Sequence, residues 1–216
     1  MSKLNTANRL YDYSISAFYV RDEFPIIADW VPQGATVIDL GAANGSLLHF
    51  LREKKDVTGV GVESAESGVL YAKKHNLDVR LGSVDVGDAY AAFKDNEFDV
   101  AICNVTIQMV LFPEIVLSEM KRIARYQIIS FPNFAYIGNR MDLLLRGRMP
   151  RPMLHGYSWY NTGHIHQLSV KDFRMVCAEF GLAVQDVAHL GSTRLLATKR
   201  SGNMFAKASV FLTESV

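Results

Sequence analysis

Residues 36–53 constrain the fold of this chain more than any other stretch. Residues 36–40 form a short run of β-branched and apolar side chains, which suits a buried parallel strand. The small residues 41–45 follow, and residues 46–53 then have helical spacing. A strand, a small-residue turn and a helix open a nucleotide-binding α/β unit. Part of the ligand lies directly on such a turn, and free N–H groups of the helix lie behind it.

Glycine spacing narrows the kind of ligand. A dinucleotide site needs G-x-G-x-x-G, but this turn has glycine at Gly41 and Gly45 and at no suitable third position, so that pattern is absent. Asp39 instead precedes Gly41 by two residues, which gives D-x-G-x-x-x-G. A second predicted strand, residues 57–62, also ends in an acid, Glu63. An ordinary α/β turn with a surface acid is the alternative interpretation.

The D-x-G-x-x-x-G pattern resembles motif I of the class I S-adenosylmethionine (SAM)-dependent methyltransferases. In that family the turn wraps the methionine part of SAM. A carboxylate at the end of the second strand, here Glu63, holds the ribose diol because it accepts from both hydroxyls. Ala43 stands where the family usually has glycine, so its Cβ is expected to crowd the ligand. A positive φ at Ala43 would cost roughly 1 kcal/mol.

The same resemblance assigns polar residues at the ends of the next two strands. After the third predicted strand, residues 79–81, Asp85 is the candidate for contacting the adenine amino group, and a solvated loop acid is the alternative. Asn104 follows the fourth predicted strand, residues 98–103, which places it near the methyl-donor sulfur or the substrate. The complete set of expected SAM- or S-adenosylhomocysteine (SAH)-binding residues is Asp39, Gly41, Ala42, Ala43, Gly45, Glu63, Ser64, Ser83, Val84, Asp85, Asn104 and Val105.

The end of the sheet gives an independent signal. Residues 127–131 form a fifth predicted strand, and residues 182–190 and 193–199 form two closing strands joined by Gly191-Ser192. Such a short link implies an antiparallel hairpin, which is typical of class I methyltransferases and not of dinucleotide folds. We therefore expect an α/β, Rossmann-like class I SAM-dependent methyltransferase fold. Its mostly parallel seven-stranded sheet ends in an antiparallel hairpin and has helices on both faces.

The chain is expected to form one SAM-binding domain over residues 1–200. Residues 1–30 form an N-terminal helical cap, and residues 134–167 form an insertion rich in Arg, Tyr, His and Trp. The insertion lies on the ligand-facing rim, where we expect a substrate lid or a docking surface, with a solvated basic helix end as the alternative. Residues 201–216 are expected to be a mobile or loosely docked tail.

Aromatic and apolar side chains between residues 10 and 29 predict one or two amphipathic helices interrupted at Pro25. Two interpretations stay open for this segment. Either Tyr11 or Tyr19 covers the cofactor, as helices before the first strand often do in methyltransferase-like folds, or the segment only packs on the sheet.

Composition excludes several classes of protein. Hydrophobic residues make up 49% of the chain and charged residues 21%, so it is globular, and a net charge of +1 gives no reason to expect nucleic acid or an anionic membrane. No apolar run approaches the roughly 20 residues of a membrane span, and the first nine residues lack a signal-peptide core. Cys103 and Cys177 make neither a disulfide framework nor a metal site. We expect a cytoplasmic protein without a metal.

Later stretches resemble the MetW family of methionine biosynthesis proteins. They are Gly45–Lys55, Ile129–Phe134, Asn139-Arg140, Leu143–Pro150, Trp159-Tyr160, Ile165-His166 and Lys171-Asp172-Phe173, and the match covers roughly residues 26–186. The most specific of them is Leu143–Pro150. MetW proteins carry the SAM-binding fold and are associated with activation of homoserine O-acyltransferase. The resemblance therefore implies a biosynthetic acyltransferase as partner.

Two classes of function follow. The first is a SAM-dependent methyltransferase acting on a small molecule, in which the protein mainly aligns donor and acceptor. The second is a SAM- or SAH-binding partner that docks on the acyltransferase through residues 140–151 and 157–160, since Arg and aromatic residues are common interface anchors. A base is needed only if the methyl acceptor must lose a proton. The candidates for that base are His155, Tyr157, Tyr160, His164 and His166.

Overall fold

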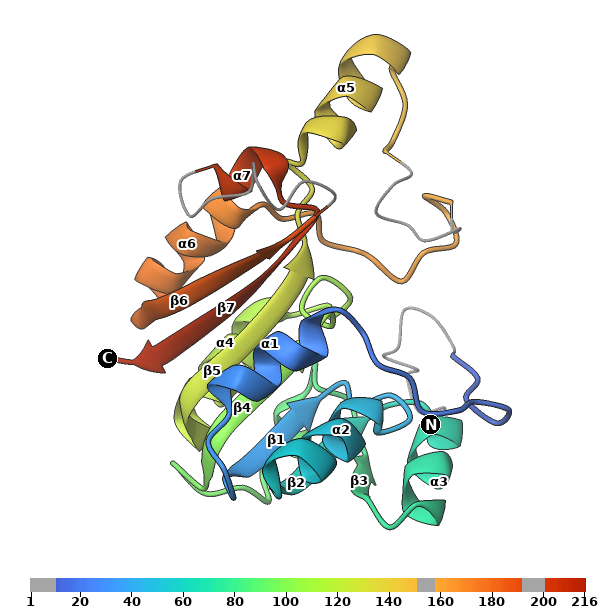
Figure 1. Ribbon diagram of the computed structural model, residues 1–216, viewed down its shortest axis with the longest axis vertical. Coiled ribbons are helices and arrows are strands. Elements are labelled where there is room, and N and C mark those ends of the chain that lie inside the picture. The colour runs from blue at the N-terminus through green and yellow to red at the C-terminus, as the bar shows by residue number, and fades with distance from the viewer. Residues whose placement is uncertain (1–10, 151–157, 192–200) are drawn as a thin grey trace.

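The computed structural model describes residues 11–150, 158–191 and 201–216. The described strands form one seven-stranded sheet in the order β3-β2-β1-β4-β5-β7-β6 (Figure 1). Strands β1 to β5 are parallel, and β7 lies antiparallel between β5 and β6. The expected fold class is confirmed. The strands are β1 (Thr36–Leu40), β2 (Thr58–Glu63), β3 (Asp78–Leu81), β4 (Phe98–Asn104), β5 (Ala124–Pro132), β6 (Leu182–Leu190) and β7 (Ala208–Ser215).

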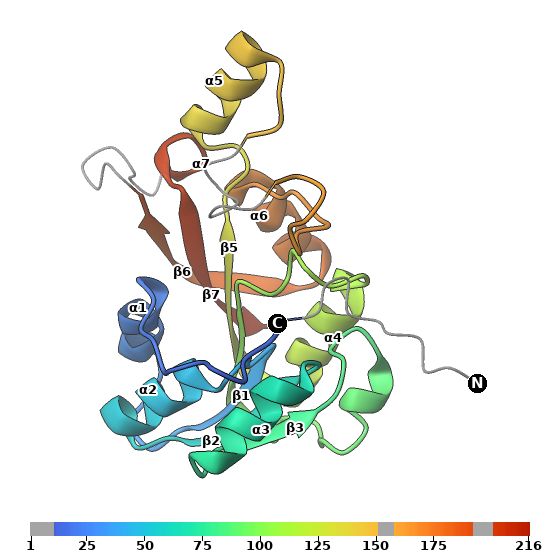
Figure 2. The same cartoon turned by 90° about the vertical axis from the view of Figure 1, so that its right-hand side faces the viewer.

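Helices cover both faces of the sheet (Figure 2). One face carries α1, α2 and α3, and the other carries α4 and α6. Among the described residues, no helix is both long and apolar enough to cross a membrane. The helices are α1 (Glu23–Trp30), α2 (Ser46–Lys55), α3 (Glu66–Lys74), α4 (Pro113–Ile123), α5 (Ile137–Arg146), α6 (Val170–Glu179) and α7 (Gly202–Phe205), with a 3-10 turn at Gly87–Ala89.

Strand β1 separates two hydrophobic clusters because successive side chains of a strand point to opposite faces. Val37 packs in the cluster that contains Leu48 of α2. Its neighbour Ile38 packs in the cluster that contains Met120 of α4 and Phe173 of α6. Val37 and Ile38 are both fully buried. A strand buried on both faces must be a continuous apolar run, and this explains why residues 36–40 gave such a clear signal.

The expectation of a loosely docked tail at residues 201–216 is wrong. This segment contains α7 and β7, and β7 pairs with β5 on one side and β6 on the other. Its centre is a run of apolar side chains, of which Val210 and Phe211 are fully buried. The closing pair of strands is antiparallel as expected, but the partner of β6 is β7. The strand predicted at residues 193–199 falls outside the described residues.

The N-terminal prediction also needs correction. Residues 11–22 contain no helix, and α1 begins at Glu23. Pro25 lies in the first turn of α1, where its missing N–H costs nothing because that donor has no partner within the helix. We call residues 11–22 the N-terminal strap.

Helix α5 stands apart from the sheet, beyond the carboxyl end of β5 (Figures 1 and 2). Its two buried residues, Asn139 and Asp142, are polar. Asn139 donates to the carbonyl of Phe134, 3.1 Å away, and this bond anchors the base of the helix. The outer part exposes apolar side chains, with Leu144 77% and Leu145 70% exposed. We call α5 the arm.

Candidate functional site

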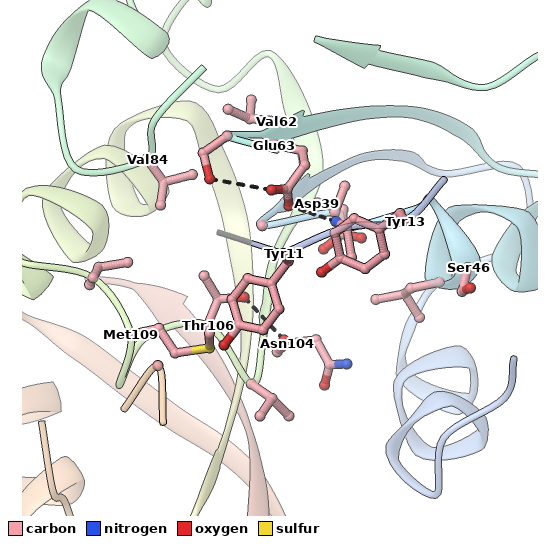
Figure 3. Close-up of a pocket in the computed structure, with 18 of the residues that line it drawn as sticks. Tyr11, Tyr13, Asp39, Ser46, Val62, Glu63, Val84, Asn104, Thr106 and Met109 are labelled. Atoms are coloured by element: carbon pink, nitrogen blue, oxygen red, sulfur yellow. Dashed lines mark hydrogen bonds between the residues drawn. The ribbon is translucent and has the colours of Figure 1, made fainter. Parts of the chain in front are cut away.

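A cavity of about 500 Å³ opens at the carboxyl ends of β1, β2 and β4 (Figure 3). This is where open α/β sheets bind ligands, next to the point at which the strand order reverses between β1 and β4. All but one of the expected cofactor residues line it; the lining members are Asp39, Gly41, Ala42, Ala43, Glu63, Ser64, Ser83, Val84, Asp85, Asn104 and Val105. The exception is Gly45, which lies behind the turn, where a Cβ would come within 2.7 Å of Leu77.

The turn after β1 has left-handed backbone at alternate positions. Gly41 has φ 85°, Ala43 has φ 52° and Gly45 has φ 81°. The N–H groups of Gly41 and Ala42 donate to the carbonyl of Val62, at 2.8 and 3.1 Å, so the turn is fixed to the end of β2. Ala43 therefore carries the strain that its position in the motif suggested, because an L-residue with a Cβ rarely adopts this conformation.

Glu63 joins the two strand ends (Figure 3). Its Oε2 accepts from the N–H of Ala43 at 2.8 Å, and its Oε1 accepts from the N–H of Ala65 at 2.7 Å and from the hydroxyl of Ser64 at 3.3 Å. A carboxylate has about four acceptor positions, so these bonds leave capacity for a ligand hydroxyl. The carboxylate is buried and held in one orientation by the backbone on both sides.

Asp39 is a buried acid at the floor of the cavity, and its side chain is 2% exposed. Burial, and then the nearby charge of Glu63, raise the pKa of Asp39 from 3.8 to about 7. Its Oδ1 has no hydrogen-bond partner within the described part of the chain. A buried acceptor without a partner is costly. The site is therefore suited to a ligand that brings a positive charge or an N–H donor to this atom.

Asp85 is buried, so the alternative of a solvated loop acid does not hold. Its Oδ1 accepts from the N–H groups of Leu111, at 2.5 Å, and Phe112, at 3.1 Å. The acid thus fixes the segment that leads from the cavity into α4. Asp85 also lines the cavity.

The end of β4 is held by β5. The Oδ1 of Asn104 accepts from the hydroxyl of Ser130, and the N–H of Val105 donates to the same hydroxyl at 2.9 Å. Val105 has φ 54°, which is a strained backbone for a β-branched residue and is typical of functional sites. Thr106 and Met109 follow and also line the cavity. Sequence reasoning stopped at Val105, although the rule that sites form at strand ends pointed to the next residues as well.

The five candidate bases differ in their position relative to the cavity. His164 lines the cavity. Tyr160 is 72% exposed and does not line it, and His166 is also exposed and outside it. His155 and Tyr157 fall outside the described residues. The strap brings Tyr11, Tyr13 and Tyr19 to the cavity. Of the two interpretations left open for this segment, this position agrees with the one in which Tyr11 or Tyr19 covers a ligand.

Comparisons with known proteins identify the family to which this chain is similar. A family model described as methionine biosynthesis protein MetW matches residues 21–213. The bifunctional methionine biosynthesis protein MetXA/MetW of Rhodopirellula baltica is 32% identical over 169 residues, which are 74% of this chain and 27% of that protein. The chain thus spans about a quarter of the length of that relative.

Solved structures share the fold. A SAM-dependent methyltransferase of Thermotoga maritima, described as a possible histamine N-methyltransferase, has a TM-score of 0.62 at 17% identity, over 90% of this chain and 88% of that one. Geranyl diphosphate C-methyltransferase of Streptomyces coelicolor, solved with SAH, has a TM-score of 0.63 at 13% identity, over 90% and 80%. At these identities the likeness shows the fold alone. The family match over residues 21–213 is more specific, and the chain belongs to the MetW family of methionine biosynthesis proteins.

Proposed function

We propose that this protein binds SAM or SAH and acts as a regulatory partner of a homoserine O-acyltransferase. The cavity suits the ligand in three places. The unpartnered Oδ1 of Asp39 matches the ammonium of the methionine part, the fixed carboxylate of Glu63 matches the ribose diol, and the second oxygen of Asp85 matches the adenine amino group. When bound, SAM would supply an activated methyl group.

The observation that carries the partner proposal is the arm. Leu144 and Leu145 are large apolar side chains on a helix that stands away from the sheet, and Met141 and Leu143 beside them are also exposed. Exposed apolar patches of this kind mark protein interfaces, and the arm's arginine residues are common interface anchors. The acyltransferase is the proposed occupant because the resemblance to MetW proteins implies it as a partner, and because in a bifunctional methionine biosynthesis relative the MetW part is joined to a second part, MetXA.

The test uses the homoserine O-acyltransferase of the same organism, purified separately. We expect this protein to raise the acyltransferase activity and to bind it in a pull-down. Leu144→Glu combined with Leu145→Glu should abolish both effects. Leu70→Glu is the matched control, because Leu70 is an equally apolar side chain, 54% exposed, on the distant helix α3. A complex that survives the double change on the arm would contradict the proposed surface.

A second candidate function is supported by His164 in the cavity. A methyltransferase acting on a small molecule needs an aligned acceptor, and an acceptor that must lose a proton needs a base. Among the histidines that the structure describes, His164 lines the cavity and could act as this base. The test is the conversion of SAM to SAH in the presence of a cell extract cleared of protein, with His164→Asn as the comparison. Turnover that exceeds the spontaneous rate and that requires the extract favours the enzyme, and no turnover favours the regulatory partner.

A further inference from the structure

Two segments that are far apart in the sequence cover the same cavity. One is the strap, which contributes Tyr11, Tyr13 and Tyr19. The other is residues 158–168, which we call the return segment because it leads from the arm back to α6; its Thr162, Gly163 and His164 also line the cavity.

The two covers meet where Tyr11 lies against Gly163. A Cβ added to Gly163 would collide with the hydroxyl of Tyr11 and would come within 2.8 Å of Cε of Met109 (Figure 3 shows Tyr11 and Met109 side by side). Glycine is therefore required at position 163 for Tyr11 to sit where it does.

Each cover is also bonded to a loop of the ligand site. On the strap side, the amide of Asn44 donates to the carbonyl of Ala17 at 3.1 Å, and the N–H of Tyr19 donates to the hydroxyl of Ser46 at 3.3 Å. Asn44 lies in the turn that follows β1, and Ser46 begins α2. These bonds attach the strap to that turn and to the start of α2.

On the other side, the N–H groups of Ile165 and His166 both donate to the carbonyl of Gln108, at 2.9 and 3.0 Å. The amide of Gln108 donates in turn to the carbonyl of Val105, at 2.8 Å. The return segment is thus held by the strained loop after β4, which lines the cavity.

We propose that the contact of Tyr11 with Gly163 is a latch that closes over bound SAH and links the occupancy of the cavity to the return segment. This inference rests on the proposed binding of SAM or SAH. A ligand that fills the cavity adds contacts to both covers and so favours the state in which they meet. Because such coupling is reciprocal, anything that holds the two covers together also tightens the binding of the ligand.

The test is hydrogen exchange of peptides from residues 13–20 and 160–168, with and without SAH, alongside calorimetric titration with SAH. In the wild type, SAH should slow exchange in both peptides. In Gly163→Ala, which displaces Tyr11, the affinity for SAH should fall about tenfold, as expected for a coupling of ordinary size. SAH should then still protect the strap peptide but no longer the peptide of residues 160–168.

Gly87→Ala is the matched control, because a Cβ at Gly87 meets nothing within 4 Å, and it should behave like the wild type. Tyr11→Ala removes the other half of the contact without altering the return segment and should reproduce the loss, even if Gly163→Ala does not fold. If wild-type protein binds SAH and only the strap peptide responds, the latch is refuted and the proposed binding stands. If SAH does not bind at all, both proposals fail.

Discussion

The strained alanine in the turn after β1 makes a quantitative prediction. Ala43 has φ 52°, a conformation that costs a residue with a Cβ about 1–2 kcal/mol and costs glycine almost nothing. Glycine also increases the conformational freedom of the unfolded chain, which lowers the stability of the folded protein by about 0.5–1 kcal/mol. The methyl group lost is only half-buried. Ala43→Gly should therefore stabilise the protein by about 0.5 kcal/mol, which raises Tm by about 1–2 °C for a chain of this size.

The neighbouring Ala42 provides a control with the opposite sign. Ala42 is buried, its φ is not positive, and its Cβ packs directly over Gly61, where an added Cβ would lie only 2.7 Å away. Ala42→Gly loses this methyl and gains the same unfolded-state freedom, so it should lower stability by about 1–1.5 kcal/mol and Tm by about 3–5 °C. Thermal unfolding of both variants at one pH gives the comparison. If Ala43→Gly destabilises the protein as much as Ala42→Gly does, the argument from backbone strain is refuted.

Three further predictions concern single side chains. Because the pKa of Asp39 is raised from 3.8 to about 7, its contribution to stability is complete below about pH 4 and is lost as the pH rises to about 7. The loss between pH 5 and pH 8 is about 2.5 kcal/mol. Asp39→Asn should remove this difference between the free energies of unfolding measured in denaturant at pH 5 and pH 8, and an equal difference in the variant and the wild type would contradict this. Ser169→Ala removes the cap that Ser169 and Asp172 form reciprocally at α6 and should cost about 1 kcal/mol in urea unfolding. Asp85→Ala leaves the N–H groups of Leu111 and Phe112 without their acceptor and should weaken SAH binding in calorimetry, whereas Asp85→Asn, which retains an oxygen, should weaken it less.

The parallel strands and the ligand turn were accessible from the sequence because local chemistry dictates them. A strand buried on both faces has to be a run of apolar residues, and β1 and β4 are such runs. A turn that approaches a ligand has to be built from small residues, and Gly41 has no space for a Cβ, which would lie 2.5 Å from Thr106. In these places the fold and the expected site require the same type of residue, so the sequence pattern was informative.

The remaining features depend on partners that are distant in the sequence. The strap has the aromatic spacing of a helix, yet two hydrogen bonds hold it in another conformation: the amide of Asn44 donates to the carbonyl of Ala17, and the N–H of Tyr13 donates to the hydroxyl of Ser67. Strand β7 was missed because its pairing with β5 and β6 is tertiary, and residues 208–215 lack a turn signal that announces a strand. The meeting of Tyr11 with Gly163 was equally inaccessible, since no local rule links an N-terminal tyrosine to a glycine in an insertion.

The position of β7 inside the sheet has a consequence for the order in which the molecule can be assembled. Strand β5 pairs on one side with β4, which precedes it in the chain. The backbone groups on its other side stay unpaired until residues 208–215 form β7. Until then β6 has no neighbour in the sheet either. An exposed strand edge is a site for pairing with other chains. A chain that has not yet added residues 208–215 therefore exposes the edge of β5, and a chaperone that shields β5 during that interval would be favoured. Strand β7 ends this exposure because it pairs with both β5 and β6.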